Sequence, residues 1–385
     1  MSWPRDDAKL ERVRALMGSE GLDALVVRAP DNVLYLTGFW PMKGYDACVF
    51  PREGDPVLIC LDASAADAQE SAWTDDVRYV RGYDERDPRP PSARTLELAL
   101  AESAPYERIG LELSLGTQAS DRMVGEPTTF TRAWFEAWPR ASDATALLSG
   151  ARALKTAQEI ERIRLANEIC AAAMEHVRSE LEPGMSESQA AAIWQGFVHG
   201  EGTGWKGRVS LALGFSLVWS GKGIRTFTAT GDRPIAESEP TLFEIWVCAD
   251  GYWCDHTKLL CPGELSAPYR ELEAALLSVY GDAIAHCRPG ASLAELDRLV
   301  RAGIGAAGYP GQPTHPICHG VGARAHEPPY AHQAGGGLVE EGMVLAIEPG
   351  CYWQGGGGLR VEDNFLITSQ GAEKLSSFPD GVVAA

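Results

Sequence analysis

The sequence predicts a two-domain protein of mixed α/β (α+β) class. A chain of 385 residues exceeds what one hydrophobic core usually serves. The first third alternates helices with short apolar strands, and the remainder contains one helix-and-strand unit twice. We therefore expect one domain over residues 1–150 and a second over residues 151–385.

The N-terminal domain is expected to be a layered α/β fold. Leu10, Val13 and Leu16 recur at helical spacing within residues 9–19, and Gly21 ends that helix. Short apolar runs predict strands over residues 24–27, 33–39, 47–50 and 56–61. This region carries no cluster of His, Asp and Glu, so we expect it to support or wall a site built elsewhere.

The second domain contains an internal repeat. A long helix is expected from Thr156, and two later helices each follow a Pro-Gly break. Ser186 with Gln189, and Ser292 with Glu295, have the spacing of a capping box at the start of these two helices. Each unit is followed by strand-like sequence that carries a pair of acids, which indicates a duplicated half-domain.

Four carboxylates lie on these apolar strands. Residues 242–257 predict a hairpin with an Asp-Gly turn, in which the pleat aims Glu244 and Asp255 into the same space. Glu348 and Glu362 lie on strands expected over residues 343–348 and 358–368. Converging acids in an apolar sheet would become protonated unless a cation neutralised them, so the pattern predicts a pair of divalent metal ions.

Three of the eight histidines lie within twelve residues. His315, His319 and His326 are interspersed with glycines, which let the backbone approach a ligand closely. Imidazole nitrogens are common metal ligands and general acids or bases. This segment is therefore the expected source of nitrogen ligands.

Several motifs resemble a known family. The phrases HGVGARAHEPP, GMVLAIEPGCY and LRVEDNFLIT resemble the metal-binding motifs of the M24, or pita-bread fold, family, which includes creatinase, aminopeptidase P and prolidase. The stretches DNVLYLTGF and ARALKTAQEIERIRLANEI resemble the creatinase-type N-terminal domain and its junction. The resemblance spans nearly the whole chain. It implies a creatinase-like domain followed by a pita-bread catalytic domain with a pseudo-two-fold repeat.

The resemblance also implies a dinuclear metal site. Asp255 and Glu362 would bridge two ions of manganese, cobalt, zinc or iron, and Glu244 and His319 would complete the two coordination spheres. Glu348 would be both a ligand and the catalytic base. His326 and His315 would steady the tetrahedral intermediate and the substrate carbonyl. The implied reaction is cleavage of a peptide or peptide-like C–N bond by a metal-bound hydroxide, as in Xaa-Pro aminopeptidase and prolidase.

Three departures from the family pattern leave alternatives open. Glu244 stands where the family usually has aspartate, Trp246 where it has glycine, and Phe227-Thr228 where it has a histidine. Together with many aromatic residues, they allow a non-peptidase member that acts on a small cationic metabolite: a creatinase-like or ectoine-type amide hydrolase, or a sulfonium lyase.

Two further alternatives need no catalysis. The domain could be a binding module that has lost its metal. In the other alternative, Glu348 and Glu362 are strand-edge acids paired with Arg360 or Lys374, and His319 is a turn residue.

Composition narrows the possible partners. There are 34 Lys and Arg against 53 Asp and Glu, and this net charge of −19 disfavours nucleic acid and anionic membranes. We expect a cytoplasmic protein, because no apolar run reaches the roughly 20 residues of a membrane span and the start lacks a signal-peptide pattern. The nine scattered cysteines do not fit a disulfide framework, and most of them are expected to be small buried hydrophobic residues. By resemblance, the protein would be a homodimer.

Overall fold

The computed structural model describes residues 3–42, 44–113, 128–225, 228–353 and 356–385. The chain divides into two compact units, Met1–Arg152 and Ala153–Ala385. Each unit has its own buried core and its own sheets.

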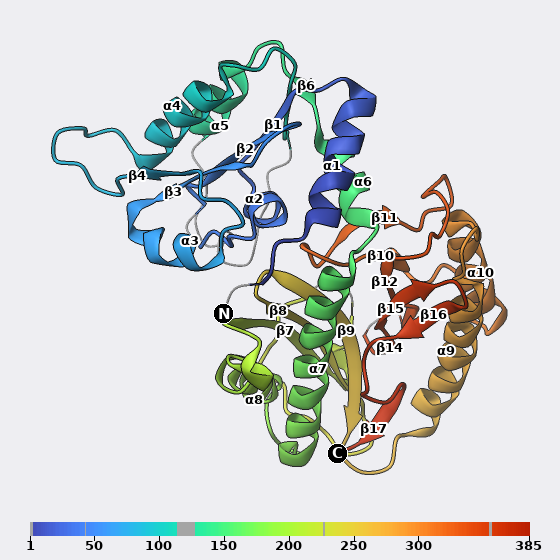
Figure 1. Ribbon diagram of the computed structural model, residues 1–385. Coiled ribbons are helices and arrows are strands. Elements are labelled where there is room, and N and C mark those ends of the chain that lie inside the picture. The colour runs from blue at the N-terminus through green and yellow to red at the C-terminus, as the bar shows by residue number, and fades with distance from the viewer. Residues whose placement is uncertain (1–2, 43, 114–127, 226–227, 354–355) are drawn as a thin grey trace. The chain divides into compact units, whose positions relative to one another are not determined.

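The first unit is built on a mixed sheet with strand order β4-β3-β2-β1-β5-β6 (Figure 1). Strand β2 pairs antiparallel with β1 and β3, whereas the β3–β4, β1–β5 and β5–β6 pairs are parallel. The strands are β1 (Ala24–Val27), β2 (Ala47–Pro51), β3 (Val57–Leu61), β4 (Val77–Val80), β5 (Ile109–Leu111) and β6 (Ser142–Asp143). The helices are α1 (Asp7–Glu20), α2 (Pro30–Thr37), α3 (Ala65–Ser71), α4 (Pro91–Ser103), α5 (Thr128–Ala137) and α6 (Thr145–Ala153), the last of which reaches the junction between the units.

Most of the elements predicted here are confirmed, and one is wrong. Helix α1 ends at Gly21 in the left-handed conformation (φ 69°), and three of the four expected strands form. The segment predicted as a strand over residues 33–39 is instead α2, with Pro30 in its first turn. Every residue of α2 is buried, so the sequence lacks the alternation of a buried and an exposed face that identifies a helix at the surface. A short apolar run does not by itself distinguish a strand from a helix.

Two helices of the second unit begin as the sequence predicts. Thr156 and Ser186 form complete capping boxes with Glu159 and Gln189. At the third predicted start, the Ser292 side chain accepts a hydrogen bond from the backbone of the residue three positions on. These helices are α7 (Ala157–Glu180), α8 (Glu187–Gly200) and α10 (Leu293–Ala306), with α9 (Ala267–His286) preceding α10.

The strands of the second unit form two main sheets. One has the order β17-β9-β8-β7, with α7 and α8 packed against it, and the other has the order β11-β10-β12-β15-β16. A pair, β13-β14, contacts α9. The strands are β7 (Ala212–Ser220), β8 (Thr241–Ala249), β9 (Tyr252–Cys261), β10 (Cys318–Gly320), β11 (Glu327–Tyr330), β12 (Val344–Ile347), β13 (Gly350–Tyr352), β14 (Gly358–Arg360), β15 (Asp363–Thr368), β16 (Gly371–Lys374) and β17 (Val382–Ala384).

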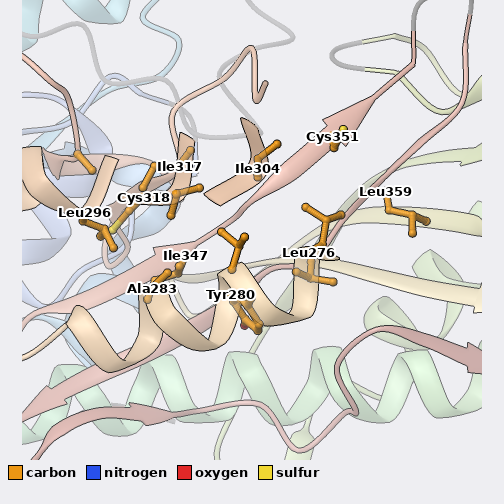
Figure 2. Packing of buried hydrophobic residues seen from close by; sticks show 14 of the residues in the cluster. Leu276, Tyr280, Ala283, Leu296, Ile304, Ile317, Cys318, Ile347, Cys351 and Leu359 are labelled. Carbon is orange, nitrogen blue, oxygen red and sulfur yellow. The ribbon is translucent and has the colours of Figure 1, made fainter. Parts of the chain in front are cut away.

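The largest core of this unit fixes the strands that carry the site. Figure 2 shows Leu276, Tyr280 and Ala283 of α9 in one cluster with Cys318 and Ile347, which belong to β10 and β12. All five side chains are almost fully buried. Because such packing tolerates little displacement, the polar residues beside Cys318 and Ile347 are held in fixed positions.

Candidate metal centre

The predicted hairpin forms with the predicted register. Strands β8 and β9 are joined by Asp250 and Gly251, both at positive φ (46° and 86°), as a tight two-residue hairpin turn requires. In this register Glu244 lies opposite Thr257, and Trp246 lies opposite Asp255. All four side chains therefore share one face of the sheet.

The other predicted ligands come from the second main sheet. His319 is the central residue of β10, and Glu348 directly follows the last residue of β12. Glu362 lies between β14 and β15, so the continuous strand predicted over residues 358–368 is wrong. The interruption has a physical reason: Glu362 forms a backbone bridge to Thr257 of β9, which joins the two sheets at this point.

All five predicted metal ligands converge. The ligand atoms of Glu244, Asp255 and Glu362 lie within 4.8 Å of one another, and so do those of His319, Glu348 and Glu362. His319 Nε2 is 3.6 Å from Asp255 Oδ2 and 3.4 Å from Glu348 Oε1. Glu362 belongs to both groups, and Asp255 connects them, which is an arrangement suited to two ions with shared ligands.

Unsatisfied polar atoms indicate that this set fits a divalent cation. Both carboxylate oxygens of Asp255 and Nε2 of His319 are buried and lack a hydrogen bond of normal geometry. Their ionisable neighbours are His326, 3.2 Å from Asp255 Oδ2, and Glu348, 3.4 Å from His319 Nε2. Leaving such atoms unpaired is costly, because they lose water without a replacement. Oxygen ligands with one imidazole are a donor set that manganese, iron, cobalt and zinc all accept.

Arg360 lies among the carboxylates. Its guanidinium contacts Glu244, and it lies 3.9 Å from Glu348 Oε2 and 4.0 Å from Glu362 Oε2. Its Nε donates a hydrogen bond of 2.6 Å to Thr257 Oγ1, which in turn donates one of 2.7 Å to Glu362. The single charge of Arg360 does not balance four carboxylates, so the set still favours added cations.

The other two predicted histidines also lie at the site. His326 Nε2 is 3.2 Å from Asp255 Oδ2, and its side chain is 46% exposed. His315 is buried, with Nδ1 3.2 Å from Glu348 Oε2 and Nε2 3.1 Å from the hydroxyl of Tyr352. His326 is therefore accessible to a molecule that enters from solvent, whereas His315 contacts Glu348 in the buried interior.

The pKa values of the site residues reflect burial and crowding. Burial raises the pKa of Asp255 well above its usual value, and the charges of Glu362 and Glu348 add to this, although the indole of Trp246 opposes it. Burial also raises the pKa of Glu348, but hydrogen bonds from His315 and His319 outweigh it and lower that pKa to about 2. Burial lowers the pKa of His319, yet Glu348 and Glu362 raise it above the ordinary value.

Three residues organise the site without having been predicted to do so, although one alternative drawn from the sequence paired Arg360 with Glu348 and Glu362. The side chain of Asn364 accepts a hydrogen bond from the backbone N–H of Asp255 and donates one to its carbonyl (3.0 and 2.8 Å). Asn364 thereby replaces a missing strand pairing beside a ligand. Thr257 and Arg360 are the other two. Their signal in the sequence is polarity at buried positions of otherwise apolar strands.

Neighbouring polar residues belong to a separate network. His256 points away from the ligand set, as the pleat predicts, and its nitrogens face Asn167 Oδ1 (2.8 Å) and Asp363 Oδ1 (3.2 Å). His256 also forms, with Cys170 and Cys254, a separate buried group whose ligand atoms lie within 4.8 Å of one another. All nine cysteines are free and buried, as expected.

The alternative in which Glu348 and Glu362 are strand-edge acids paired with Arg360 or Lys374 agrees with the contacts only in part. Arg360 lies within 4.0 Å of both glutamates, but both glutamates are buried. Lys374 pairs with Asp363 and Asp380 rather than with either glutamate. Arg360 approaches both glutamates only at the outer limit of an ion pair. Phe227, at the position of the missing histidine, lies outside the described residues.

No helix in the described part of the chain combines the length and the apolar composition needed to cross a membrane.

Comparison with known proteins identifies relatives over nearly the full length. Residues 161–369 match the metallopeptidase family M24, and residues 9–125 match the creatinase/prolidase N-terminal domain. An uncharacterised peptidase of Bacillus subtilis (strain 168) is 26% identical over 97% of this chain and 99% of its own length.

Solved structures with the same fold also match this chain over nearly its full length. A prolidase from Pyrococcus horikoshii OT3 superposes with a TM-score of 0.80 at 23% identity, covering 97% of this chain and 99% of that one. An X-Pro aminopeptidase from Thermotoga maritima MSB8 superposes with a TM-score of 0.77 at 21% identity, covering 95% and 98%. These matches confirm the predicted fold, and the family favours peptide hydrolysis over the alternative chemistry on a small cationic metabolite.

Proposed function

Because the chain belongs to the metallopeptidase family M24 and is thus a metal-dependent hydrolase, we propose that it cleaves short peptides at an Xaa-Pro bond. The substrate class comes from the relatives, among which are an X-Pro aminopeptidase and a prolidase. The observation that carries the proposal is the convergence of five buried ligand residues whose ligand atoms form two overlapping groups.

We propose that two divalent ions bind here. Their ligands would be Glu244, Asp255, His319, Glu348 and Glu362, with Asp255 and Glu362 shared between the ions; the overlap of the two ligand groups at Glu362 supports this. Bound ions would supply a nucleophile at neutral pH and stabilise the negative charge that develops on the scissile carbonyl. Manganese, cobalt, zinc and iron all suit this donor set.

The remaining chemistry falls to the chain's own groups. Glu348 is proposed as the base that takes up a proton at a carboxylate oxygen, and it is already ionised in the metal-free site, where its pKa is lowered. His326, half-exposed beside Asp255, would donate a hydrogen bond to the substrate carbonyl as negative charge grows on it. His315, held by the hydroxyl of Tyr352, would orient Glu348.

The wider biological setting is also part of the proposal. We propose that residues 1–150 form the N-terminal domain and residues 151–385 the catalytic domain, in a cytoplasmic homodimer. Light scattering on the purified full chain tests the dimer, and a monomer at assay concentrations would contradict it.

The activity is tested with protein purified without chelator. Elemental analysis should find a stoichiometric transition metal, and Xaa-Pro dipeptides should be hydrolysed at rates that a chelator abolishes and manganese or cobalt restores. A parallel panel of small cationic amides and guanidino compounds should remain intact. Absence of bound metal together with inactivity after metal addition would refute the proposal, and turnover restricted to the cationic panel would restore the alternative.

A further inference from the structure

We propose that Phe215 and Trp246 form a substrate subsite that selects a large apolar side chain on the residue whose carbonyl is attacked. This inference rests on the proposed peptidase function and specifies its substrates.

The two aromatic residues form one row with a predicted metal ligand. Phe215 of β7 lies opposite Trp246 of β8, and Trp246 lies opposite Asp255 of β9. Directly opposed residues project from the same face of a sheet. The row therefore leads without interruption from the ligand set across two neighbouring strands to Phe215.

Exposure changes along this row. Asp255 is 1% exposed, Trp246 is 9% exposed and Phe215 is 40% exposed. The rings of Phe215 and Trp246 are 5.3 Å apart at 32°, and the ring of Trp246 is 6.2 Å from that of His326. Trp246 thus fills the space beside the ligands, and Phe215 presents an apolar ring to solvent next to a catalytic centre.

The indole has a polar atom directed at the same place. The buried indole N–H of Trp246 faces the carboxylate of Asp255 on the opposing strand, where it favours the ionised form of that carboxyl and so lowers its pKa. Trp246 therefore belongs to the site and is not ordinary core.

The spacing sets the size of the selected side chain. Neighbouring strands are about 4.8 Å apart, so Phe215 lies roughly 10 Å from Asp255 along the row. With its carbonyl held at the ligands, a leucine side chain can lie against Trp246 and a phenylalanine ring can reach further toward Phe215, whereas glycine and alanine can do neither. Phe215 and Trp246 offer no charged group, so a charged side chain would lose hydration there.

The test compares kcat/KM for Phe-Pro, Leu-Pro, Ala-Pro, Gly-Pro and Lys-Pro with metal-loaded enzyme. The wild type should prefer Phe-Pro and Leu-Pro over Gly-Pro by about tenfold or more, which is the effect of burying part of a large apolar side chain. Phe215→Ala should remove most of this preference, because kcat/KM should fall much more for Phe-Pro and Leu-Pro than for Gly-Pro. Tyr83→Ala, which removes an aromatic side chain that is 82% exposed in the first unit, is the matched control and should behave like the wild type.

Two results would overturn the subsite. One is an unchanged Phe-Pro to Gly-Pro ratio in Phe215→Ala, and the other is a preference of the wild type for Lys-Pro, which would show that the rings recognise a cation. Calorimetric binding of the same dipeptides separates this inference from the proposed function. Tighter binding of Phe-Pro without any cleavage would refute only the peptidase activity, and equal binding of Phe-Pro and Gly-Pro would refute only the subsite.

Discussion

The guanidinium of Arg360 contacts the carboxylate of Glu244 inside the ligand set, where both side chains are almost fully buried. Glu244 is one of the five residues proposed to bind metal, so this carboxylate has two competing partners, the arginine and an ion. The same guanidinium is hydrogen-bonded to Thr257, which holds Glu362. Arg360 thus connects ligands that come from different strands.

Replacing Arg360 should destabilise the metal-free protein. Arg360→Gln leaves buried carboxylates without their neighbouring positive charge, which should lower the free energy of unfolding by about 3 kcal/mol. Added manganese should reduce this loss. Urea unfolding with chelator and with metal measures both effects. Arg164→Gln, which breaks a surface pair with Glu373, is the control and should cost less than about 1 kcal/mol. Equal losses for the two variants would contradict the role of Arg360.

Replacing Glu362 should remove metal without unfolding the protein. Glu362 belongs to both ligand groups, so Glu362→Gln should weaken both sites, by more than the roughly 100-fold seen when only a supporting residue is changed. Elemental analysis after dialysis measures metal content, and circular dichroism checks the fold. Glu373→Gln at the surface should retain full metal. Undiminished metal in Glu362→Gln would show that the ions bind elsewhere.

Metal affinity should rise with pH. In the metal-free protein the pKa of His319 lies above its usual 6.5, and the pKa values of Asp255 and Glu362 are also raised. A ligand must lose its proton to bind a metal ion, so protons compete with the ion for these side chains. Because the pKa values are raised, this competition extends to higher pH than for ordinary side chains, and metal affinity should fall as pH decreases through the raised pKa values. Calorimetric titration with manganese in buffers of different ionisation enthalpy should detect proton release. Affinity independent of pH around and above 6.5 would contradict this.

Replacing His326 should slow catalysis more than it affects binding of metal. Its side chain is 46% exposed, so His326→Ala should fold normally. Loss of a hydrogen-bond donor to the transition state should lower kcat by about 100-fold or more. His332→Ala, an exposed histidine outside the ligand groups, is the matched control. A kcat near that of the wild type, with metal retained, would remove His326 from the mechanism.

Two glycines in the first unit should respond in opposite ways to alanine. Gly38 ends α2 at φ +76°, and an added Cβ would lie 2.5 Å from Trp73 Nε1, so Gly38→Ala should cost about 2 kcal/mol or more. Gly18 lies within α1 with no atom within 4 Å of such a Cβ, so Gly18→Ala should leave stability unchanged or raise it by up to about 1 kcal/mol. Thermal unfolding of both variants measures the difference. A tolerated Gly38→Ala would contradict the observed end of α2.

Local patterns predicted much of the structure. The Asp250-Gly251 turn and the alternation of residues along β8 and β9 were sufficient for the register that sets Glu244 and Asp255 on one face. The capping box predicted at Ser186 marked a helix start correctly, and the helix expected from Thr156 also begins there. These features depend on residues only a few positions apart, so the local amino-acid sequence is enough to specify them.

Other features depended on distant contacts. The apolar segment over residues 33–39 suits a strand or a buried helix equally, and packing on all sides decides for α2. Glu362 leaves the strand pattern because its backbone bridges to Thr257, more than a hundred residues earlier. Asn364 and Arg360 owe their roles to the same junction between sheets.

The sequence by itself therefore determined the family, the repeat and the identity of the acidic and histidine residues that could bind metal, because these depend on residue type, period and spacing. Only the tertiary structure decided which groups share a volume: that Arg360 lies against Glu244, that Asn364 supports Asp255, and that Trp246 and Phe215 extend the site in one row. The physical reason is that burial and charge pairing arise between segments that meet only when the two sheets join, and no local pattern encodes that meeting.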